Sequence, residues 1–163
     1  MKSIQIVSHG KLTKEDFKQK IGKVGLDANI LIDMILSPDF SVSVIILKLV
    51  RDKFLCTSKR AYLEAVGILK HEYNHNNASK EVRDLTRKLN IESFIERRED
   101  FGAAFGLLED HKLDIKTHFK DMLILANLKR NNVSHIISKD KLFIKTAEEE
   151  GFKVINIPKI KRN

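Results

Sequence analysis

The stretch Val24–Asp33, which reads Val-Gly-Leu-Asp-Ala-Asn-Ile-Leu-Ile-Asp, decides the fold that we predict for this chain. It is a short apolar strand that ends at Asp27 and passes directly into the apolar start of a helix. A carboxylate where a buried strand meets a helix costs several kcal/mol unless a partner offsets its charge. A bound cation is a natural partner, so we expect other acidic residues to converge on Asp27.

The rest of the chain alternates between short apolar strands and helical segments. After the strand at 23–27, further strands are predicted at 53–57, 91–95, 134–138 and 152–157, and helices at 30–36, 40–51, 59–70, 79–89, 101–109, 116–130 and 142–150. This alternation predicts a parallel sheet covered by helices on both faces. We therefore predict an α/β fold, a three-layer sandwich around a central five-stranded parallel sheet.

Length and composition predict one globular domain. The chain has 163 residues, of which 42% are hydrophobic and 32% charged, and it contains only seven Gly and two Pro. These values are typical of a single globular domain without long linkers. We predict an N-terminal extension at residues 1–22, the α/β domain at 23–158 and a basic C-terminal tail at 159–163.

Several features predict a cytoplasmic protein without a membrane segment. No apolar run reaches the roughly 18 residues that span a bilayer. The first residues lack the apolar core and cleavage site of a signal peptide. Cys56 is the single cysteine, so an internal disulfide is excluded and a reducing compartment is expected.

The net charge favours a polyanionic partner. Thirty Lys and Arg against 22 Asp and Glu give a net charge of +8 and a pI near 9.5. Such a surface attracts nucleic acid through counterion release, although it is equally compatible with an ordinary solvated surface. The basic residues predicted to guide a nucleic acid are Lys59, Arg60, Lys139 and Lys141.

Two carboxylates are predicted to lie at the same edge of the sheet. In an open parallel sheet, ligands bind beyond the carboxyl ends of the strands, where the strand order reverses. Asp27 ends the first strand and Asp140 follows the fourth. If these two strands are neighbours, both carboxylates share one crevice. Ser138 is two residues before Asp140, a spacing that places its hydroxyl on the same side of an extended chain.

Two helical carboxylates complete the predicted set. Glu64 lies at the edge of the apolar stripe of its helix rather than on the solvent face. Asp121 is more unusual, because its neighbours three, four and seven residues later are Ile124, Leu125 and Leu128. Other acidic runs lie among polar residues and are predicted to face solvent, namely Glu99-Asp100 and Glu148-Glu149-Glu150.

Four carboxylates in one cleft predict a site for hard cations. They would repel one another strongly unless a positive charge offset them. Carboxylate oxygens suit Mg²⁺ or Mn²⁺ better than zinc. In a basic surface, the chemistry that fits is phosphodiester hydrolysis by metal ions about 3.5–4 Å apart.

At this point the chain resembles the PIN domain family, over roughly residues 23–157. The matching features are Leu26–Ile32, Glu64 in the helix after the second strand, Asp121 in a late helix and Ile136–Asp140. Members of this family are mainly metal-dependent ribonucleases with a five-stranded parallel sheet, and some are toxins. The resemblance implies that Mg²⁺ or Mn²⁺ is bound by Asp27, Glu64, Asp121 and Asp140, with Asn29 and Ser138 as hydrogen-bonding support.

The same resemblance implies RNA as the substrate, a homodimer and a possible antitoxin partner that blocks the cleft. Two alternatives remain open. One is a nucleic-acid-binding module with the same fold and little catalytic activity, and DNA also remains open as the substrate. The other is a zinc metalloprotease, because His71-Glu72-Tyr73-Asn74-His75 matches the His-Glu-x-x-His signature. The surrounding residues are polar, whereas an active-site helix is normally packed in a core.

Overall fold

The structure is a computed structural model that describes residues 22–158. The predicted C-terminal tail, and the predicted N-terminal extension apart from Gly22, lie outside the described residues. Within the described range, no single helix is long and apolar enough to cross a membrane. A sharply bent pair, 28–36 with 38–50, reaches that length and composition only when its two parts are taken together.

The predicted parallel sheet is confirmed. Its five strands lie in the order β3-β2-β1-β4-β5, and each neighbouring pair is parallel. The strands are β1 (Lys23–Leu26), β2 (Phe54–Ser58), β3 (Glu92–Phe94), β4 (His135–Ile137) and β5 (Lys153–Val154). The strand β5 pairs over two residues only, so the prediction of a strand at 152–157 was too long.

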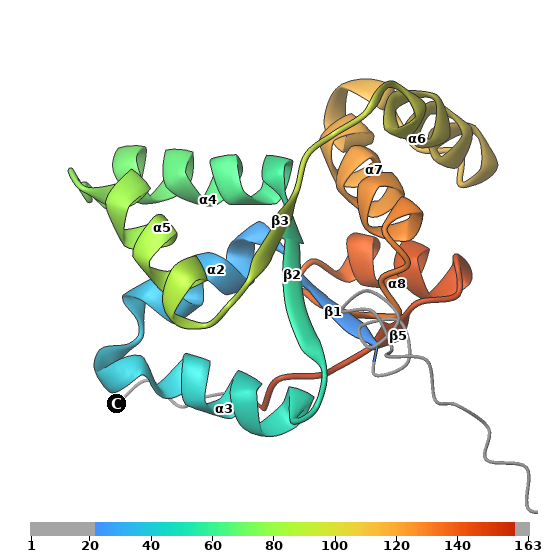
Figure 1. The fold of residues 1–163 in the computed structure, drawn as a ribbon. Helices are drawn as coiled ribbons and strands as arrows, with labels where there is room; N and C mark the ends of the chain where they lie inside the picture. The colour runs from blue at the N-terminus through green and yellow to red at the C-terminus, as the bar shows by residue number, and fades with distance from the viewer. Residues whose placement is uncertain (1–21, 159–163) are drawn as a thin grey trace, which may run out of the picture.

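Helices cover both faces of the sheet, as predicted. In Figure 1, α2 to α5 lie on the left of the sheet and α6 to α8 on its right. The bounds are α2 (Ala28–Leu36), the 3₁₀ turn η1 (Pro38–Phe40), α3 (Ser41–Val50), α4 (Lys59–His71), α5 (Ala78–Lys88), α6 (Arg98–Asp110), α7 (Ile115–Arg130) and α8 (Lys141–Glu149).

The core is built around β1 and α7. All four residues of β1 are buried, and α7 contains seven consecutive buried residues, 122–128. A helix that is buried on every side is covered by a second layer, and here α6 runs beside α7 (Figure 1). A Cβ added at Gly25 would lie 2.9 Å from Leu128 Cδ1, so the glycine permits the close approach of α7 to β1.

The strand order reverses between β1 and β4. The chain extends the sheet from β1 in one direction through β2 and β3, and in the other through β4 and β5. Leu26 pairs with Ile137, and the Asp27 N–H donates a hydrogen bond to the Ile137 carbonyl at 3.1 Å. The first and fourth strands are therefore neighbours, which was the condition for Asp27 and Asp140 to share one edge.

Candidate metal centre

Asp27 is held at both carboxylate oxygens. It is 9% exposed and forms the N-cap of α2, where its Oδ1 accepts a hydrogen bond from the Ala28 N–H at 2.7 Å. Its Oδ2 accepts from the Ser138 hydroxyl at 2.6 Å and from the Asn29 amide at 3.2 Å. The two residues predicted to support the site thus contact Asp27 directly.

Asp140 is oriented in a similar way. It is the N-cap of α8, and its Oδ1 accepts from the Phe143 N–H at 2.9 Å. The Asp140 N–H donates to the Ser138 Oγ at 3.1 Å. Ser138 therefore connects the two strand-end carboxylates, because its one hydroxyl contacts the side chain of Asp27 and the backbone of Asp140.

Glu64 and Asp121 come from helices that begin at well-formed caps. The Ser58 Oγ caps α4 by accepting from the Ala61 N–H at 3.0 Å. Asp114 caps α7 by accepting from the Thr117 N–H at 3.0 Å. Both acidic residues lie within the first two turns of their helices and are partly buried.

Asp121 has a strongly perturbed carboxyl group. Burial raises its pKa from 3.8 to about 6, and the charges of Asp140, Asp27 and Glu64 act in the same direction. His118, whose Nδ1 lies 3.9 Å from the Asp121 Oδ2, opposes the shift. The four predicted carboxylates are therefore close enough to repel one another, although α2, α4, α7 and α8 are far apart in sequence.

The pKa values of two other carboxyl groups are raised as well. Burial raises the pKa of Asp27, the Ser138 hydroxyl and the Ala28 N–H oppose it, and the Asp140 charge adds to the rise. Burial and the Asp27 charge raise the pKa of Glu64, against Lys120 and Arg60. These nearby groups leave the repulsion only partly offset, which is the condition that a bound cation relieves.

The donor set fits Mg²⁺ or Mn²⁺, which prefer carboxylate oxygens. Within residues 22–158, however, no three His, Cys, Asp or Glu side chains are close enough to hold one ion as they stand. The carboxylates share one electrostatic field without forming a closed coordination shell. A Mg²⁺ ion is commonly bound by one or two carboxylates and keeps several waters, so a closed protein shell is not needed.

Three of the four basic residues predicted to guide RNA have partners within the protein. Lys59 Nζ lies 4.0 Å from the centre of the Tyr62 ring. Arg60 donates to both carboxylate oxygens of Glu96, at 2.7 and 2.9 Å. Lys139 and Lys141 are both exposed and flank Asp140. The Lys139 ammonium is paired with the carboxylate of Asp33.

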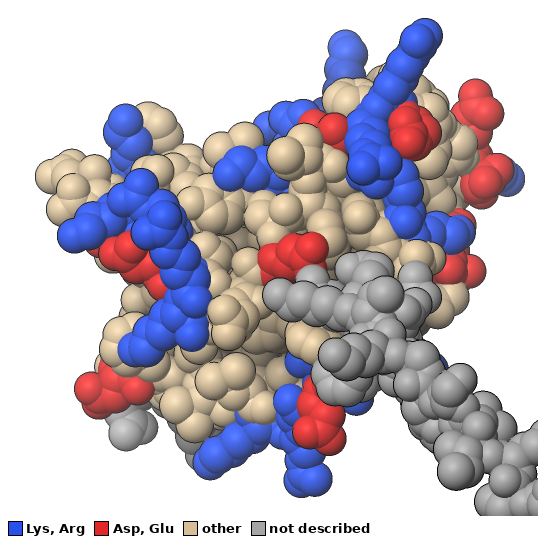
Figure 2. Space-filling view, viewed as in Figure 1, with Lys and Arg blue, Asp and Glu red and all other residues tan. Residues whose placement is uncertain are grey.

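The basic charge is not confined to the surroundings of the carboxylate cluster. Figure 2 shows Lys and Arg side chains gathered over α5 on the left and near α6 at the upper right, with acidic side chains exposed near the centre of this face. The net charge of +8 is thus distributed over several surfaces. It increases the general attraction of the protein for polyanions without marking one path for them.

The geometry required for a zinc protease is not formed. The helix α4 ends at His71, so His71 and His75 are not one turn apart on a common helix. The His75 Nδ1 instead lies 2.7 Å from the Glu81 Oε2. The sequence match predicted two imidazoles facing one ion, and it was wrong because the helix stops before the second.

The prediction that Asp100 faces solvent was also wrong. Asp100 is 1% exposed and accepts from the Arg130 guanidinium at 2.6 and 2.9 Å, from the Asn127 amide at 3.0 Å and from the Arg97 N–H at 2.9 Å. Burial favours the neutral form, but these donors outweigh it and hold the pKa of Asp100 below its usual value. Nothing in the local pattern indicated that Arg130, thirty residues later, would neutralise it.

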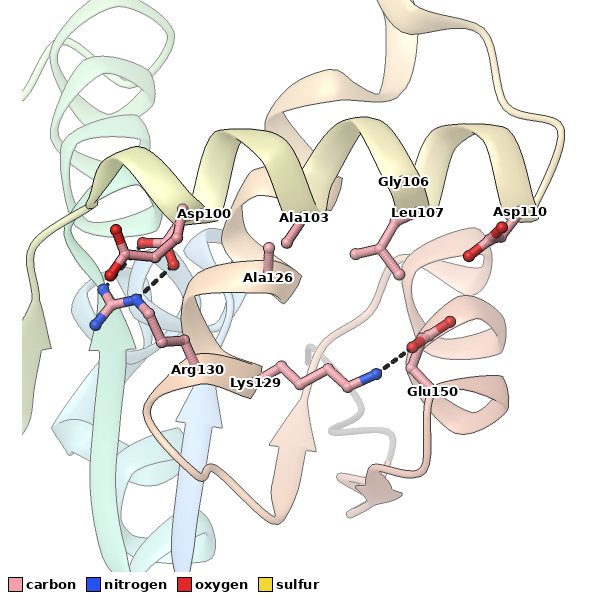
Figure 3. A pocket seen from close by; sticks show the side chains of 10 residues that line it. Asp100, Ala103, Gly106, Leu107, Asp110, Ala126, Lys129, Arg130 and Glu150 are labelled. Atoms are coloured by element: carbon pink, nitrogen blue, oxygen red, sulfur yellow. Dashed lines mark hydrogen bonds and ion pairs between the residues drawn. The ribbon is translucent and has the colours of Figure 1, made fainter.

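Asp100 lines a hollow of about 440 Å³ between α6, α7 and the end of α8 (Figure 3). Its cations are paired with acids of the same hollow, Arg130 with Asp100 and Lys129 with Glu150. Glu150 also contacts His111 at 2.8 Å. Both cations that line the hollow are thus held in ion pairs, so we regard this region as a structural junction rather than the reactive site.

Comparison of the sequence with models of known families and with curated proteins gives no match. Solved structures do match. VapBC2 from Rickettsia felis, in a complex with a DNA fragment from its promoter, is 18% identical with a TM-score of 0.62, over 83% of this chain and 99% of that one. VapC20 from Mycobacterium tuberculosis, described as a sarcin-ricin loop cleaving toxin, is 14% identical with a TM-score of 0.60, over 79% and 95%.

A third structure, VapBC-1 from nontypeable Haemophilus influenzae, is 16% identical with a TM-score of 0.58, over 82% of this chain and 97% of that one. At these identities, the likeness is one of fold. The chain has the fold of VapC-type toxins, which is the PIN fold that the sequence resemblance predicted. What the chain does must be argued from its own residues.

Proposed function

We propose that this chain is a metal-dependent endoribonuclease that hydrolyses RNA phosphodiester bonds, with Mg²⁺ or Mn²⁺ bound by Asp27, Glu64, Asp121 and Asp140. The observation that carries this proposal is the pKa of Asp121, which burial and three other carboxylates raise to about 6. At neutral pH such a cluster repels itself, and a divalent cation offsets that repulsion.

The chain's own residues orient the cluster. Bound to such a cluster, divalent ions supply an activated water and offset the charge on the leaving oxygen. Asp27 and Asp140 are aimed by the backbone N–H groups that they cap, at 2.7 and 2.9 Å. Ser138 and Asn29 hold the second oxygen of Asp27. The protein then needs no nucleophile of its own.

We further propose that the protein is the toxin of a toxin–antitoxin pair, acts in the cytoplasm and forms a homodimer. The similar structures include VapBC complexes and a toxin that cleaves the sarcin-ricin loop, which supports both the partner and the RNA substrate. Exposed apolar side chains give such partners a surface to bury. On α3 and the turn before it these are Phe40, Val44 and Leu47, and on α6 they are Phe101 and Phe105.

A second candidate function is a nucleic-acid-binding module with the same fold and weak or absent turnover. One observation favours it, namely that no three of the described acidic or histidine side chains are placed to hold one ion. The two functions differ in what a divalent ion does. The nuclease requires it for cleavage, whereas the binding module retains RNA with a steep salt dependence and leaves it intact.

RNA cleavage with a single charge removed tests the proposal. Because an ion and its ligands contribute several kcal/mol to such a reaction, Asp121→Asn is expected to lower Mn²⁺-dependent cleavage by about 10²–10³-fold. The matched control is Glu148→Gln, which removes an exposed acid from α8 and should leave cleavage unchanged. Cleavage of single-stranded DNA of the same sequence is measured in parallel, and the comparison shows whether RNA or DNA is the preferred substrate.

Undiminished cleavage by Asp121→Asn would show that the carboxylate cluster is not the reactive site. A wild type that binds RNA but cleaves none with Mg²⁺ or Mn²⁺ would favour the binding module. Far-ultraviolet circular dichroism of each variant shows whether a loss of cleavage arises from unfolding.

A further inference from the structure

An ion pair links α2 to the loop that carries Asp140. The Asp33 Oδ2 lies 2.6 Å from the Lys139 Nζ. Asp33 is on α2, six residues after Asp27, and Lys139 lies between Ser138 and Asp140 in the connection from β4 to α8. The side chain of Asp33 is 22% exposed and that of Lys139 is 53% exposed, so the pair lies at the surface beside the carboxylate cluster.

A second contact holds the same lysine from the same helix. Asn29 lies one helical turn before Asp33, so both side chains project from one face of α2. The Asn29 Oδ1 accepts a hydrogen bond from the Lys139 backbone N–H at 3.2 Å, while its amide donates to the Asp27 Oδ2. Lys139 is thus held at its backbone by Asn29 and at its ammonium by Asp33.

Together with Ser138, these contacts fix a short segment of chain. Ser138 contacts Asp27, Lys139 contacts Asn29 and Asp33, and Asp140 follows immediately. Each of these contacts connects the start or the first two turns of α2 with the loop that places the Asp140 carboxylate. The position of Asp140 relative to Asp27 therefore depends on how firmly Lys139 is held.

The ion pair also engages the ammonium group of Lys139, which the sequence predicted to bind RNA. Its ammonium already has an acidic partner, so a phosphate would have to displace Asp33. We infer that Asp33 is a positioning residue, which holds Lys139 and thereby sets the separation of the Asp27 and Asp140 carboxylates for metal binding. This inference rests on the proposed function. We call the contacts of Asn29 and Asp33 with Lys139 the α2 clamp.

Mn²⁺ affinity in the absence of RNA tests the α2 clamp. Residues that hold metal ligands typically contribute 10–100-fold to affinity, and a partly exposed pair one step further away should contribute about three- to tenfold. We expect Asp33→Asn and Lys139→Gln each to raise the Kd for Mn²⁺ by about that factor, measured by isothermal titration calorimetry. The double variant should be no weaker than either single one, because both break the same pair.

The sign of the Lys139→Gln effect separates positioning from simple electrostatics. Removing a positive charge beside a cation site should tighten Mn²⁺ binding by Coulomb attraction alone, whereas loss of the α2 clamp weakens it. The matched control is Lys129→Gln, which breaks the pair with Glu150 at a lysine of nearly equal exposure, 54%. Asp33→Glu, which keeps the charge, should restore most of the affinity.

Hydrogen exchange of the metal-free protein supplies a second readout. The backbone amides of residues 139–140 should exchange faster in Asp33→Asn and Lys139→Gln, and at the wild-type rate in Lys129→Gln. Wild-type exchange together with wild-type Kd in Asp33→Asn, or tighter Mn²⁺ binding by Lys139→Gln, would overturn the α2 clamp and leave the proposed function intact. A wild type that binds no Mn²⁺ would instead overturn the proposed function, and exchange alone would then decide the α2 clamp.

Discussion

The helix α7 contributes to two acidic sites, one near each of its ends. Near its C-terminal end, Arg130 pairs with Asp100, which is almost fully buried and has a pKa below its usual value. Near its N-terminal end, Asp121 is only partly buried, yet its pKa is raised to about 6. The more buried carboxylate is thus the better stabilised one, so burial alone does not determine which site is under electrostatic stress.

The difference lies in the source of positive charge. Asp100 receives hydrogen bonds from a guanidinium, an amide and a backbone N–H, so its charge is offset within the protein. Asp121 faces three other carboxylates, and His118 opposes them only from 3.9 Å. A carboxylate with an internal cation maintains the fold, whereas a cluster without one is available to an external cation.

The largest expected effect on stability is at the internally neutralised site. Asp100→Asn leaves Arg130 without a counter-charge, and breaking such a pair should lower the free energy of unfolding by about 3 kcal/mol. Urea unfolding monitored by circular dichroism measures this loss. Glu99→Gln, at the exposed neighbouring residue, should change stability little. An equal effect from both variants would contradict the structural role of Asp100.

A smaller effect is expected where a hydroxyl connects two carboxylates. Ser138→Ala removes the donor to Asp27 at 2.6 Å and the acceptor of the Asp140 N–H. Because groups that orient metal ligands typically contribute 10–100-fold, Mn²⁺ affinity should fall about tenfold. Ser134→Ala, at the opposite end of β4, is the control and should bind Mn²⁺ as the wild type does. Wild-type affinity in Ser138→Ala would remove Ser138 from the site.

The smallest effect has the opposite sign to that of Asp100→Asn. In the metal-free protein at pH 7, Asp121→Asn should raise the free energy of unfolding by about 1 kcal/mol, after allowance for screening at a side chain that is one-third exposed. The variant removes a charge that its neighbours repel. Denaturant unfolding at pH 7 without divalent ions measures this gain, and a variant less stable than the wild type would contradict it.

The pH dependence provides a further check on the sign. The pKa of Asp121 is 3.8 in the unfolded chain and about 6 in the folded protein, so its charge destabilises the fold progressively as pH rises between these values. The gain from Asp121→Asn should therefore be absent below about pH 4 and complete above about pH 6. For Asp100, whose folded pKa is lowered, the stabilisation is present above pH 3.8 and lost as pH falls below it.

The sheet and its order of elements could be predicted because β1, β2 and β4 carry buried apolar residues and each is followed by a helix. Asp121 could be found for a related reason, since a carboxylate beside Ile124, Leu125 and Leu128 contradicts the pattern of its own helix. A local contradiction of this kind is visible without the tertiary structure.

Contacts between distant residues could not be predicted. Asp100 lies in a polar run, and its partner Arg130 follows thirty residues later on another helix. Asp33 likewise meets Lys139 only because β1 and β4 are adjacent and bring α2 beside the start of α8. The helix predicted at 59–70 agrees with the end of α4 at His71, so the His-Glu-x-x-His match, which needs a helix through His75, suggested a site that the fold does not form.

Thermal unfolding in the presence and absence of Mn²⁺ compares the two sites most directly. If the Asp121 cluster binds a divalent cation, Mn²⁺ at 100 times its Kd should stabilise the wild type by about 2.7 kcal/mol, and this gain should disappear in Asp121→Asn. The metal-free variant should also unfold at a higher temperature than the metal-free wild type. An Mn²⁺-induced shift of equal size in both proteins, or none in the wild type, would show that the cluster is not a metal site.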